Sequence, residues 1–467
     1  MQQMPWNMHQ IKQCKKETGQ AMLSDEHTLV SYAQDFGKLT QSNPAVVCIP
    51  TSIESIRALL NYANQNKLPV TIRGKGLSQG GQSLSVNGGL TLHLEQLDKV
   101  LDKEAESIWV EANTSWAQLI DTSLKTSQIP AVLPYNCNLS IGGVLSAAGL
   151  GAASFKFGSI SSQVKALEVV LANGQVEVVD SKSSLFHACL SGQGRFAVIT
   201  KACIKLRPCR KQVRTFFLTY LDREQWLADL LEIKHGEADY LEAFCSPSIQ
   251  GAKLISGRRL PFAQWLYAMH VSIEYDKEAP ELEALSKRLN PWQLMHVQDE
   301  SIHAYLHRHD SRFEFMKLTG QWELLHPWYE CFIPANLVAN HLDEILAELP
   351  IHYASLIHIL PLAQRQQTGF FMLPETDNIF ELMILNPGVN SQLLSSCLTA
   401  IEVLDKRFLQ QGGKRYLSGY LGASLNKNYW QKHFGSFYKE WVDLKKQYDE
   451  NGIFCSLLYS RDPQEII

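Results

Sequence analysis

The sequence of 467 residues lacks the patterns that mark several classes of protein. No two cysteines have the C-x-x-C spacing of zinc or dithiol sites, and no cysteine lies near a histidine at zinc-ligand spacing. Residues 1–30 hold no apolar run long enough for a signal peptide or a membrane span. The net charge of −4 leaves no excess of positive charge for nucleic acid or an anionic membrane. We therefore expect no metal site, no nucleic-acid partner and no membrane partner.

Cysteine is present, but it is scattered along the chain. Many of the ten cysteines lie in apolar runs, among them Cys48 in AVVCIP and Cys203 in KACIKL. Free buried thiols are typical of proteins in reducing compartments. We therefore expect unpaired cysteines and a cytoplasmic location.

The length exceeds the roughly 250–300 residues that a single core holds, so we expect two domains or one domain with a large insertion. In the first ~200 residues predicted helices and strands mix, which indicates the α+β class. Thr51 and Glu54 have the spacing of a capping box before an amphipathic helix. Asn173-Gly174 predicts the turn of a hairpin. Residues 211–429 are richer in histidine and tryptophan, and we interpret them as a separate substrate or cap domain.

The segment TIRGKGLSQGGQSL, residues 71–84, places four glycines directly after a short apolar strand. Because glycine has no Cβ, backbone N–H groups in such a loop can converge on an anion such as a pyrophosphate. The loop is not a P-loop, since Lys75 is followed by neither Ser nor Thr. It is not a Rossmann fingerprint, since a strand and not a helix comes next. A phosphate-binding loop and a glycine-rich surface turn both remain open.

A second segment, LPYNCNLSIGGVLSAAGLGAASFKFG at residues 133–158, is dominated by small residues. Such a segment leaves space unless something else fills it, and a flat cofactor would do so. The alternative is a tightly packed helix rich in alanine and glycine. Two segments of this kind in one domain favour a cofactor-shaped void.

Six segments, in order along the chain, resemble the FAD-binding enzymes of the vanillyl-alcohol oxidase fold, and above all the cytokinin dehydrogenases. They are AQDFGKLTQSNPAVVCIPTSIESI, RGKGLSQGGQSL, LSIGGVLSAAGL, GQGRFAVITKACIKL, HPWYECFIP and HFGSFYKEWVDLKKQYD. The resemblance implies an α+β, two-domain PCMH-type fold, in which residues 1–210 and 430–467 bind FAD. Residues 211–429 would be an inserted cap domain, built on an antiparallel sheet with helices, that binds a small-molecule substrate. Oxygen or a quinone would accept the electrons.

The residues that the resemblance assigns to FAD binding lie in the glycine loop, the small-residue segment and two later positions. They are Ile72, Gly74, Lys75, Gly76, Leu77, Ser78, Gln82, Tyr135, Ser140, Gly142, Gly143, Ser146, Leu150, Val198 and Tyr416. Trp328 would form a wall of the substrate pocket, with a plain core aromatic as the alternative.

The sequence departs from the family pattern around the flavin ring. Leu77 stands where the family has the histidine that bonds covalently to the flavin, so we expect noncovalent FAD. Cys137 lies one position off the spacing of a second tether, and we expect a buried thiol there. Tyr135 falls on the place of the family's catalytic aspartate and has an ordinary pKa near 10, which makes it a poor base. Glu314 is a possible replacement, and an exposed surface carboxylate is the alternative.

Two functions follow from these features. The first is an FAD-dependent oxidoreductase that holds FAD noncovalently and takes hydride from a small amine or alcohol, with Tyr135 or Glu314 in a catalytic role. The second is a catalytically degenerate FAD-binding protein that retains the scaffold for binding or regulation.

Overall fold

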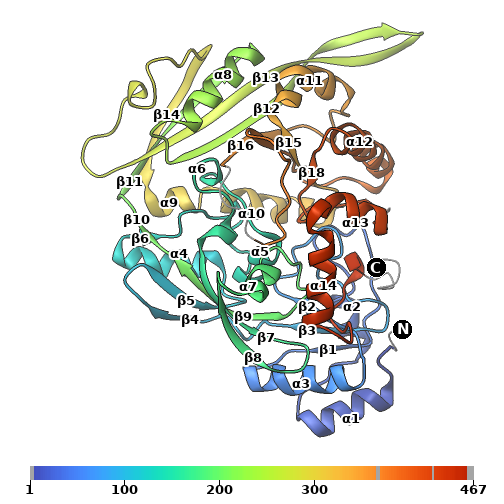
Figure 1. Cartoon of the computed structure of the whole chain (residues 1–467). Coiled ribbons are helices and arrows are strands. Elements are labelled where there is room, and N and C mark those ends of the chain that lie inside the picture. Colours follow the sequence, from blue (N-terminus) through green and yellow to red (C-terminus); the bar gives the residue numbers. More distant parts are fainter. Residues whose placement is uncertain (1–4, 364–368, 423–424, 460–467) are drawn as a thin grey trace.

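The computed structural model describes residues 5–363, 369–422 and 425–459 (Figure 1). Small sheets of the N-terminal part occupy the lower half of Figure 1, and one large sheet with its helices occupies the upper half. Helices and strands are mixed in both halves, which confirms the predicted α+β class. All ten cysteines are free thiols, and eight of them are buried, as expected.

The first sheet is a three-stranded parallel sheet that ends at the glycine-rich loop. Its strands, in spatial order, are β1 (Val46–Cys48), β3 (Leu90–His93) and β2 (Val70–Arg73). Helix α3 (Ile53–Gln65) connects β1 to β2. Its N-cap is Ser52, whose Oγ accepts a hydrogen bond from Ser55 N at 3.2 Å, so the predicted capping box that begins at Thr51 is wrong by one residue. A hydroxyl on either residue satisfies the sequence pattern, and only the backbone conformation decides between them.

The second sheet is antiparallel and has five strands. In spatial order they are β4 (Val100–Lys103), β5 (Ser107–Glu111), β9 (Val198–Lys205), β7 (Val164–Val170) and β8 (Val176–Asp180). Strands β7 and β8 form the predicted hairpin, with Gly174 at a φ of +77° in the turn. A two-stranded antiparallel ribbon pairs β6 (Gln128–Ile129), which lies between β5 and β7 in the chain, with β10 (Arg207–Pro208), which follows β9.

The large sheet has eight strands, and every neighbouring pair is antiparallel. In spatial order they are β14 (Gln293–Ser301), β11 (Gln212–Tyr220), β13 (Arg258–Tyr275), β12 (Tyr240–Ile255), β16 (Ile357–Leu362), β17 (Ile379–Ile384), β15 (Tyr329–Pro334) and β18 (Lys414–Arg415). The predicted antiparallel sheet of the cap is therefore confirmed. The hairpin of β12 and β13 extends beyond the rest of the chain at the top of Figure 1.

Helices complete both halves, and none in the described residues is long and apolar enough to cross a bilayer. The N-terminal part holds α1 (Met8–Thr18), α2 (Glu26–Ser31), α4 (Trp116–Ser123), α5 (Ile141–Ala147), α6 (Ser154–Phe157) and α7 (Ser184–Cys189). The cap holds α8 (Arg223–Lys234), α9 (Ile302–Leu306), α10 (Asp310–Leu318), α11 (Ala335–Glu348) and α12 (Ser391–Leu409). Near the C-terminus α13 (Lys427–Phe434) and α14 (Tyr438–Tyr448) pack on each other.

The large sheet has one apolar face and one face with buried polar residues. Side chains alternate along a strand, so Tyr329, Cys331 and Ile333 of β15 point together into the core that α8, α11 and α12 cover. Glu330, between them in the chain, points to the opposite face. This second face is turned toward the glycine-rich loops of the N-terminal part, and the space between them is the candidate site.

One buried carboxylate holds the shape of the C-terminal segment where this segment pairs with the first sheet. Asp449 accepts hydrogen bonds from the backbone N–H groups of Ile453 at 2.9 Å and Phe454 at 2.8 Å, and it pairs with Lys445. Phe454 then pairs in parallel with Val70 of β2. Asp449 is 2 % exposed, so its charge depends on these partners and not on water.

We expect Asp449→Ala to lower the free energy of unfolding by about 3–5 kcal/mol, because it leaves the buried Lys445 ammonium without its counter-charge. Urea unfolding followed by circular dichroism measures the change. Asp443→Ala is the matched control, since Asp443 pairs with Lys439 at the same spacing on the exposed side of α14. Equal effects of the two substitutions would contradict the assignment.

Candidate active site

A cavity of about 290 Å³ lies between the N-terminal loops and the polar face of the large sheet. This volume is close to the lower end of the range for small-molecule sites. One wall is the glycine-rich loop after β2 together with α5, and the opposite wall includes Trp328, Glu330 and Glu381 of the cap. The cavity therefore joins the two segments that the sequence predicted to face a cofactor.

The glycine-rich loop is held in shape by Asp35. One oxygen of this buried carboxylate accepts hydrogen bonds from the Ser78 hydroxyl at 2.9 Å and from Gly81 N at 3.0 Å. Burial raises the pKa of Asp35, and both hydrogen bonds lower it. Gly76 has a φ of +69°, a conformation that side-chain-bearing residues rarely adopt. The loop thus presents backbone and small side chains to the cavity.

The loop and α5 approach each other so closely that a side chain would not fit. A Cβ at Gly74 would lie 2.5 Å from Oγ of Ser140, and a Cβ at Gly143 would lie 2.8 Å from the same atom. Gly142 N donates to Ala112 O at 2.7 Å, and a Cβ at Gly142 would lie 2.9 Å from Cβ of Ala112. These glycines set the backbone-lined wall of the cavity.

Several buried polar atoms at the cavity have no hydrogen-bond partner within the described residues. They are Oδ1 of Asn113, the hydroxyl of Tyr135, Nε2 of Gln193, both ring nitrogens of His358 and Oε1 of Glu381. An unsatisfied buried polar group costs free energy, and a polar ligand removes that cost. Backbone-lined walls at one end and unpaired polar groups along the cavity fit a dinucleotide that ends in a flat ring.

Most residues predicted to contact FAD line this cavity. They are Ile72, Gly74, Lys75, Gly76, Leu77, Ser78, Gln82, Tyr135, Ser140, Gly142, Gly143, Ser146, Leu150 and Tyr416, and Trp328 lies there too. Val198 does not line it, because its fully buried side chain points into the core while Ala197 and Ile199 on either side face the cavity. Gln82 is also bound to the protein, since its amide donates to Leu417 O at 2.8 Å.

The two predicted catalytic residues lie in different environments. Tyr135 lines the cavity, and burial together with the charges of Glu242 and Glu381 raises its pKa well above 10. Tyr135 is therefore a protonated phenol at neutral pH. Glu314 is exposed on α10 and is not among the described residues that line the cavity. Its position matches the alternative of a surface carboxylate.

The structure brings two buried carboxylates to the cavity that the sequence analysis did not single out. Glu330 of β15 and Glu381 of β17 are diagonal neighbours on one face, since Glu330 pairs with Met383 and Glu381 pairs with Phe332. The Ser418 hydroxyl donates a hydrogen bond to Glu330. Burial raises the pKa of Glu330 to about 7, whereas Ser418 and Arg415 lower it. Burial and the neighbouring Glu330 raise the pKa of Glu381 well above its usual range, so Glu381 is the protonated member of the pair.

A third acidic residue lies behind Tyr135. Glu242 of β12 accepts hydrogen bonds from His309 Nε2 at 2.7 Å and Arg308 Nε at 3.2 Å. Burial raises the pKa of Glu242, but the charges of Arg308 and His309 outweigh this and hold it well below the usual range. The ring of His309 meets the ring of Tyr135 edge-on at 5.2 Å. This cluster is an ion pair with satisfied partners, unlike the pair of Glu330 and Glu381.

Comparisons with known proteins agree with the two walls of the cavity. Residues 44–180 match the family described as FAD binding domain, and residues 235–456 match the family described as cytokinin dehydrogenase 1, FAD and cytokinin binding. The glycine-rich loop and α5 lie in the first match, and Glu330 and Glu381 lie in the second. The chain is a distant homologue of the cytokinin dehydrogenases. It is an oxidoreductase whose cofactor is FAD, as the resemblance implied.

The related proteins match over nearly the whole chain. Cytokinin dehydrogenase 3 of Arabidopsis thaliana is 24 % identical, and the alignment covers 95 % of this chain and 90 % of that protein. Cytokinin dehydrogenase 9 of Oryza sativa subsp. japonica is 26 % identical, with 92 % and 88 % covered. An uncharacterized oxidoreductase, ORF5 in the fasciation locus of Rhodococcoides fascians, is 25 % identical, with 91 % and 95 % covered. The predicted PCMH-type arrangement of an FAD-binding domain and a cap is thus confirmed.

The sequence of this cytokinin dehydrogenase homologue contains signals that could have identified the cavity residues absent from the prediction. Glu330 comes two residues after Trp328, so strand alternation places both on one face. His358 and Glu381 are single polar residues within the apolar strand segments LIHILPL and IFELMI. A lone polar residue in a strand that is buried on both faces needs a partner, which marks it as a candidate site residue.

We expect Glu330→Gln to raise the free energy of unfolding at pH 8 by about 3 kcal/mol and to change little at pH 4.5. The folded protein holds its Glu330 proton up to about pH 7, whereas the unfolded chain releases it near pH 4.5. Stability is therefore lost as the pH rises between these values, at about 1.4 kcal/mol for each pH step of one. Glutamine removes the penalty because it carries no charge.

Urea unfolding of the FAD-free protein between pH 4.5 and 8 measures this difference. Glu314→Gln is the control, because it is the same substitution at an exposed position of α10 that does not line the cavity. A Glu330→Gln effect that does not grow with pH would show that Glu330 is ionised in the folded protein at low pH.

Proposed function

We propose that the protein binds FAD noncovalently and oxidises a small amine or alcohol, with Glu330 as the group that accepts the substrate proton. Bound FAD supplies the two-electron oxidation by taking a hydride at N5. The observation that carries the proposal is that the glycine-rich loop and the buried pair of Glu330 and Glu381 line the same cavity. The residues that hold the cofactor and the residues that hold a proton therefore meet in one space.

Noncovalent binding is supported by the side chains at the two possible attachment points. Leu77 lines the cavity, and an isobutyl group has no atom that can bond to a flavin. Cys137 does not line the cavity, and its thiol lies 3.6 Å from the carbonyl oxygens of Pro134 and Leu306. Burial raises the pKa of Cys137 to about 12, so it is an unreactive thiol at neutral pH.

Glu330 has the properties of a proton acceptor that Tyr135 lacks. A base works best when its pKa lies near the operating pH, and the pKa of Glu330 is about 7. As the substrate carbon gives up hydride, its nitrogen or oxygen loses a proton to the Glu330 carboxylate. Glu381 beside it stays protonated and adds no second negative charge. The Ser418 hydroxyl orients the carboxylate by donating to one of its oxygens.

Other side chains fix the shape of the substrate end. Trp328 donates from Nε1 to Asn386 O at 2.7 Å, and Phe36 meets the indole edge-on at 5.2 Å. This holds the indole as an apolar wall and excludes water from the carboxylate pair. The protonated Tyr135 hydroxyl, which lacks a partner in the described residues, is available to donate to the substrate.

A catalytically degenerate flavoprotein is the second candidate, and Tyr135 in the place of the family's aspartate favours it. The two candidates differ in one outcome, which is whether any donor reduces the bound flavin. Oxygen and a quinone both stay open as electron acceptors. We also propose a reducing, intracellular compartment, which the ten free cysteines support.

We expect acid or heat denaturation of the FAD-loaded protein to release all flavin into the supernatant, because Leu77 cannot bond to it. Absorbance near 450 nm of the supernatant and of the washed pellet measures how much flavin each fraction contains. Flavin that stays with the pellet would contradict noncovalent binding. We expect Leu77→His to retain flavin in the pellet, since an imidazole at this position restores the family's attachment group.

We expect Glu330→Gln to slow anaerobic flavin bleaching by a donor about 10²–10⁴-fold, the usual range for loss of a general base. A panel of alcohols and secondary amines, with cytokinins among them, serves to find the donor. In the parent protein the bleaching rate should rise with pH to a plateau above about pH 7, because the carboxylate must be ionised to accept a proton. The variant should lack this rise.

Glu314→Gln is the matched control and should bleach at the parent rate, because Glu314 is exposed on α10. Equal rates for the Glu330 variant and the parent would show that Glu330 does not accept the substrate proton. Protein that binds FAD and is bleached by no member of the panel would favour the degenerate candidate.

A further inference from the structure

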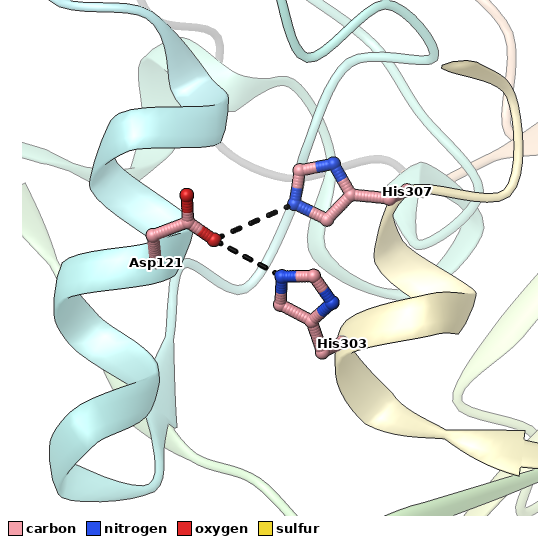
Figure 2. Close-up of side chains that lie close together, drawn as sticks. All are labelled: Asp121, His303 and His307. Atoms are coloured by element: carbon pink, nitrogen blue, oxygen red, sulfur yellow. Dashed lines mark hydrogen bonds and ion pairs between the residues drawn. The ribbon is translucent and has the colours of Figure 1, made fainter.

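Three metal-ligating side chains meet on the surface between the N-terminal part and the cap. Asp121 lies on α4, His303 lies on α9, and His307 directly follows α9 (Figure 2). Oδ1 of Asp121 is 3.1 Å from Nε2 of His303 and 3.9 Å from Nε2 of His307. All three ligand atoms lie within 4.8 Å of one another. The cluster is separate from the FAD cavity, since none of the three residues lines it.

The geometry is close to that of a bound transition metal. Zn²⁺ takes nitrogen and carboxylate oxygen ligands at about 2.0–2.2 Å, and tetrahedral ligands at that distance lie about 3.3 Å apart. Oδ1 of Asp121 lies 3.1 Å and 3.9 Å from the two histidine nitrogens, and all three atoms lie within 4.8 Å of one another, so small side-chain rotations would bring them to that spacing. His303 and His307 are four residues apart, which places both on one side of a helical turn, and their rings stack with centroids 4.6 Å apart. Figure 2 shows both rings directed at the carboxylate.

The hydrogen bond of His307 to a second carboxylate points to a cation. Nδ1 of His307 lies 2.8 Å from Oδ2 of Asp310, which requires the ring proton on Nδ1 when the imidazole is neutral. Nε2 then carries a lone pair that faces Asp121, is buried and has no hydrogen-bond partner in the described residues. A metal cation bound at Nε2 would meet both this nitrogen and the carboxylate of Asp121. A carboxylate behind a ligating histidine is also the usual outer partner at zinc sites.

We propose that Asp121, His303 and His307 bind one Zn²⁺, with water completing the coordination. Two imidazoles and one carboxylate suit Zn²⁺ or a similar transition ion and disfavour Mg²⁺ and Ca²⁺, which prefer oxygen ligands alone. Asp121 and His303 are 58 % and 59 % exposed at their side chains, so solvent reaches the open position. The spacing of the cysteines predicts no metal site, and Asp121 is too far in sequence from the two histidines for a local pattern to mark the cluster.

Bound Zn²⁺ joins two elements that the chain itself connects only through 178 intervening residues between α4 and α9. His307 is followed directly by Arg308 and His309, which hold Glu242 next to Tyr135. The metal therefore fixes the part of the cap that carries this ion pair against the N-terminal part. Binding to the folded state alone also raises the melting temperature.

Calorimetric titration of the full-length, tag-free protein with ZnCl₂, after dialysis against a chelator, tests the proposal. We expect one Zn²⁺ per chain and a rise in melting temperature, with no heat of binding from MgCl₂. His303→Gln and Asp121→Asn should each weaken Zn²⁺ binding at least tenfold and abolish the rise in melting temperature. Both residues are exposed, so the variants should fold as the parent does without zinc.

His341→Gln is the matched control, because His341 forms an exposed pair with Glu344 at 3.4 Å and has no second histidine beside it. This control should bind Zn²⁺ as tightly as the parent. The proposal is overturned if the parent binds no Zn²⁺ at 100 times the protein concentration. Unchanged affinity in His303→Gln and Asp121→Asn would also overturn it, because the metal would then lie elsewhere.

Discussion

Close contact between two backbones without side chains is the constraint on which the site depends. Gly74 and Gly143 both lie against the hydroxyl of Ser140, and a Cβ at either position would overlap with it. Gly142 is pressed against Ala112 at the end of β5 in the same way. Because Gly74, Gly142 and Gly143 have no room for a side chain, they present peptide backbone to the cavity. Peptide N–H groups are the natural partners of phosphate oxygens, so the requirement for close packing and the requirement for a cofactor wall are met by the same residues.

The cap supplies the opposite wall through strand alternation. In β15, β16 and β17 the residues of one parity form an apolar core with the covering helices, and the residues of the other parity include Glu330, His358 and Glu381. Burying these groups without full hydrogen bonding opposes folding. Burial also lowers the pKa of His358 to about 3 and raises that of Glu330 to about 7. The cap therefore gives up stability at the face where it places its polar groups, which is a common property of functional sites.

Side chains from both parts of the chain line the cavity. Leu77 and Tyr135 come from the N-terminal part and line the cavity. Glu330 and Glu381, on the cap side, place titratable groups in the same cavity. The proposed transfer of a proton to Glu330 on the cap side is compatible with an FAD wall that is made of backbone and hydrocarbon. The cluster of Asp121, His303 and His307 lies where these two parts of the chain meet on the outside.

Local pattern alone determined much of the fold and one wall of the site. The hairpin at Gly174, the strand before the glycine-rich loop and the residues of that loop could be read from the sequence because each depends on neighbours in the chain. The antiparallel sheet of the cap and the FAD cofactor were predicted from the resemblance to the cytokinin dehydrogenases. Tertiary structure alone decided that Val198 faces the core, that Ser52 caps α3, and that Glu330 lies beside Glu381. These depend on strand register and on which face another part of the chain covers, and such contacts join residues too distant in sequence for any local pattern to specify.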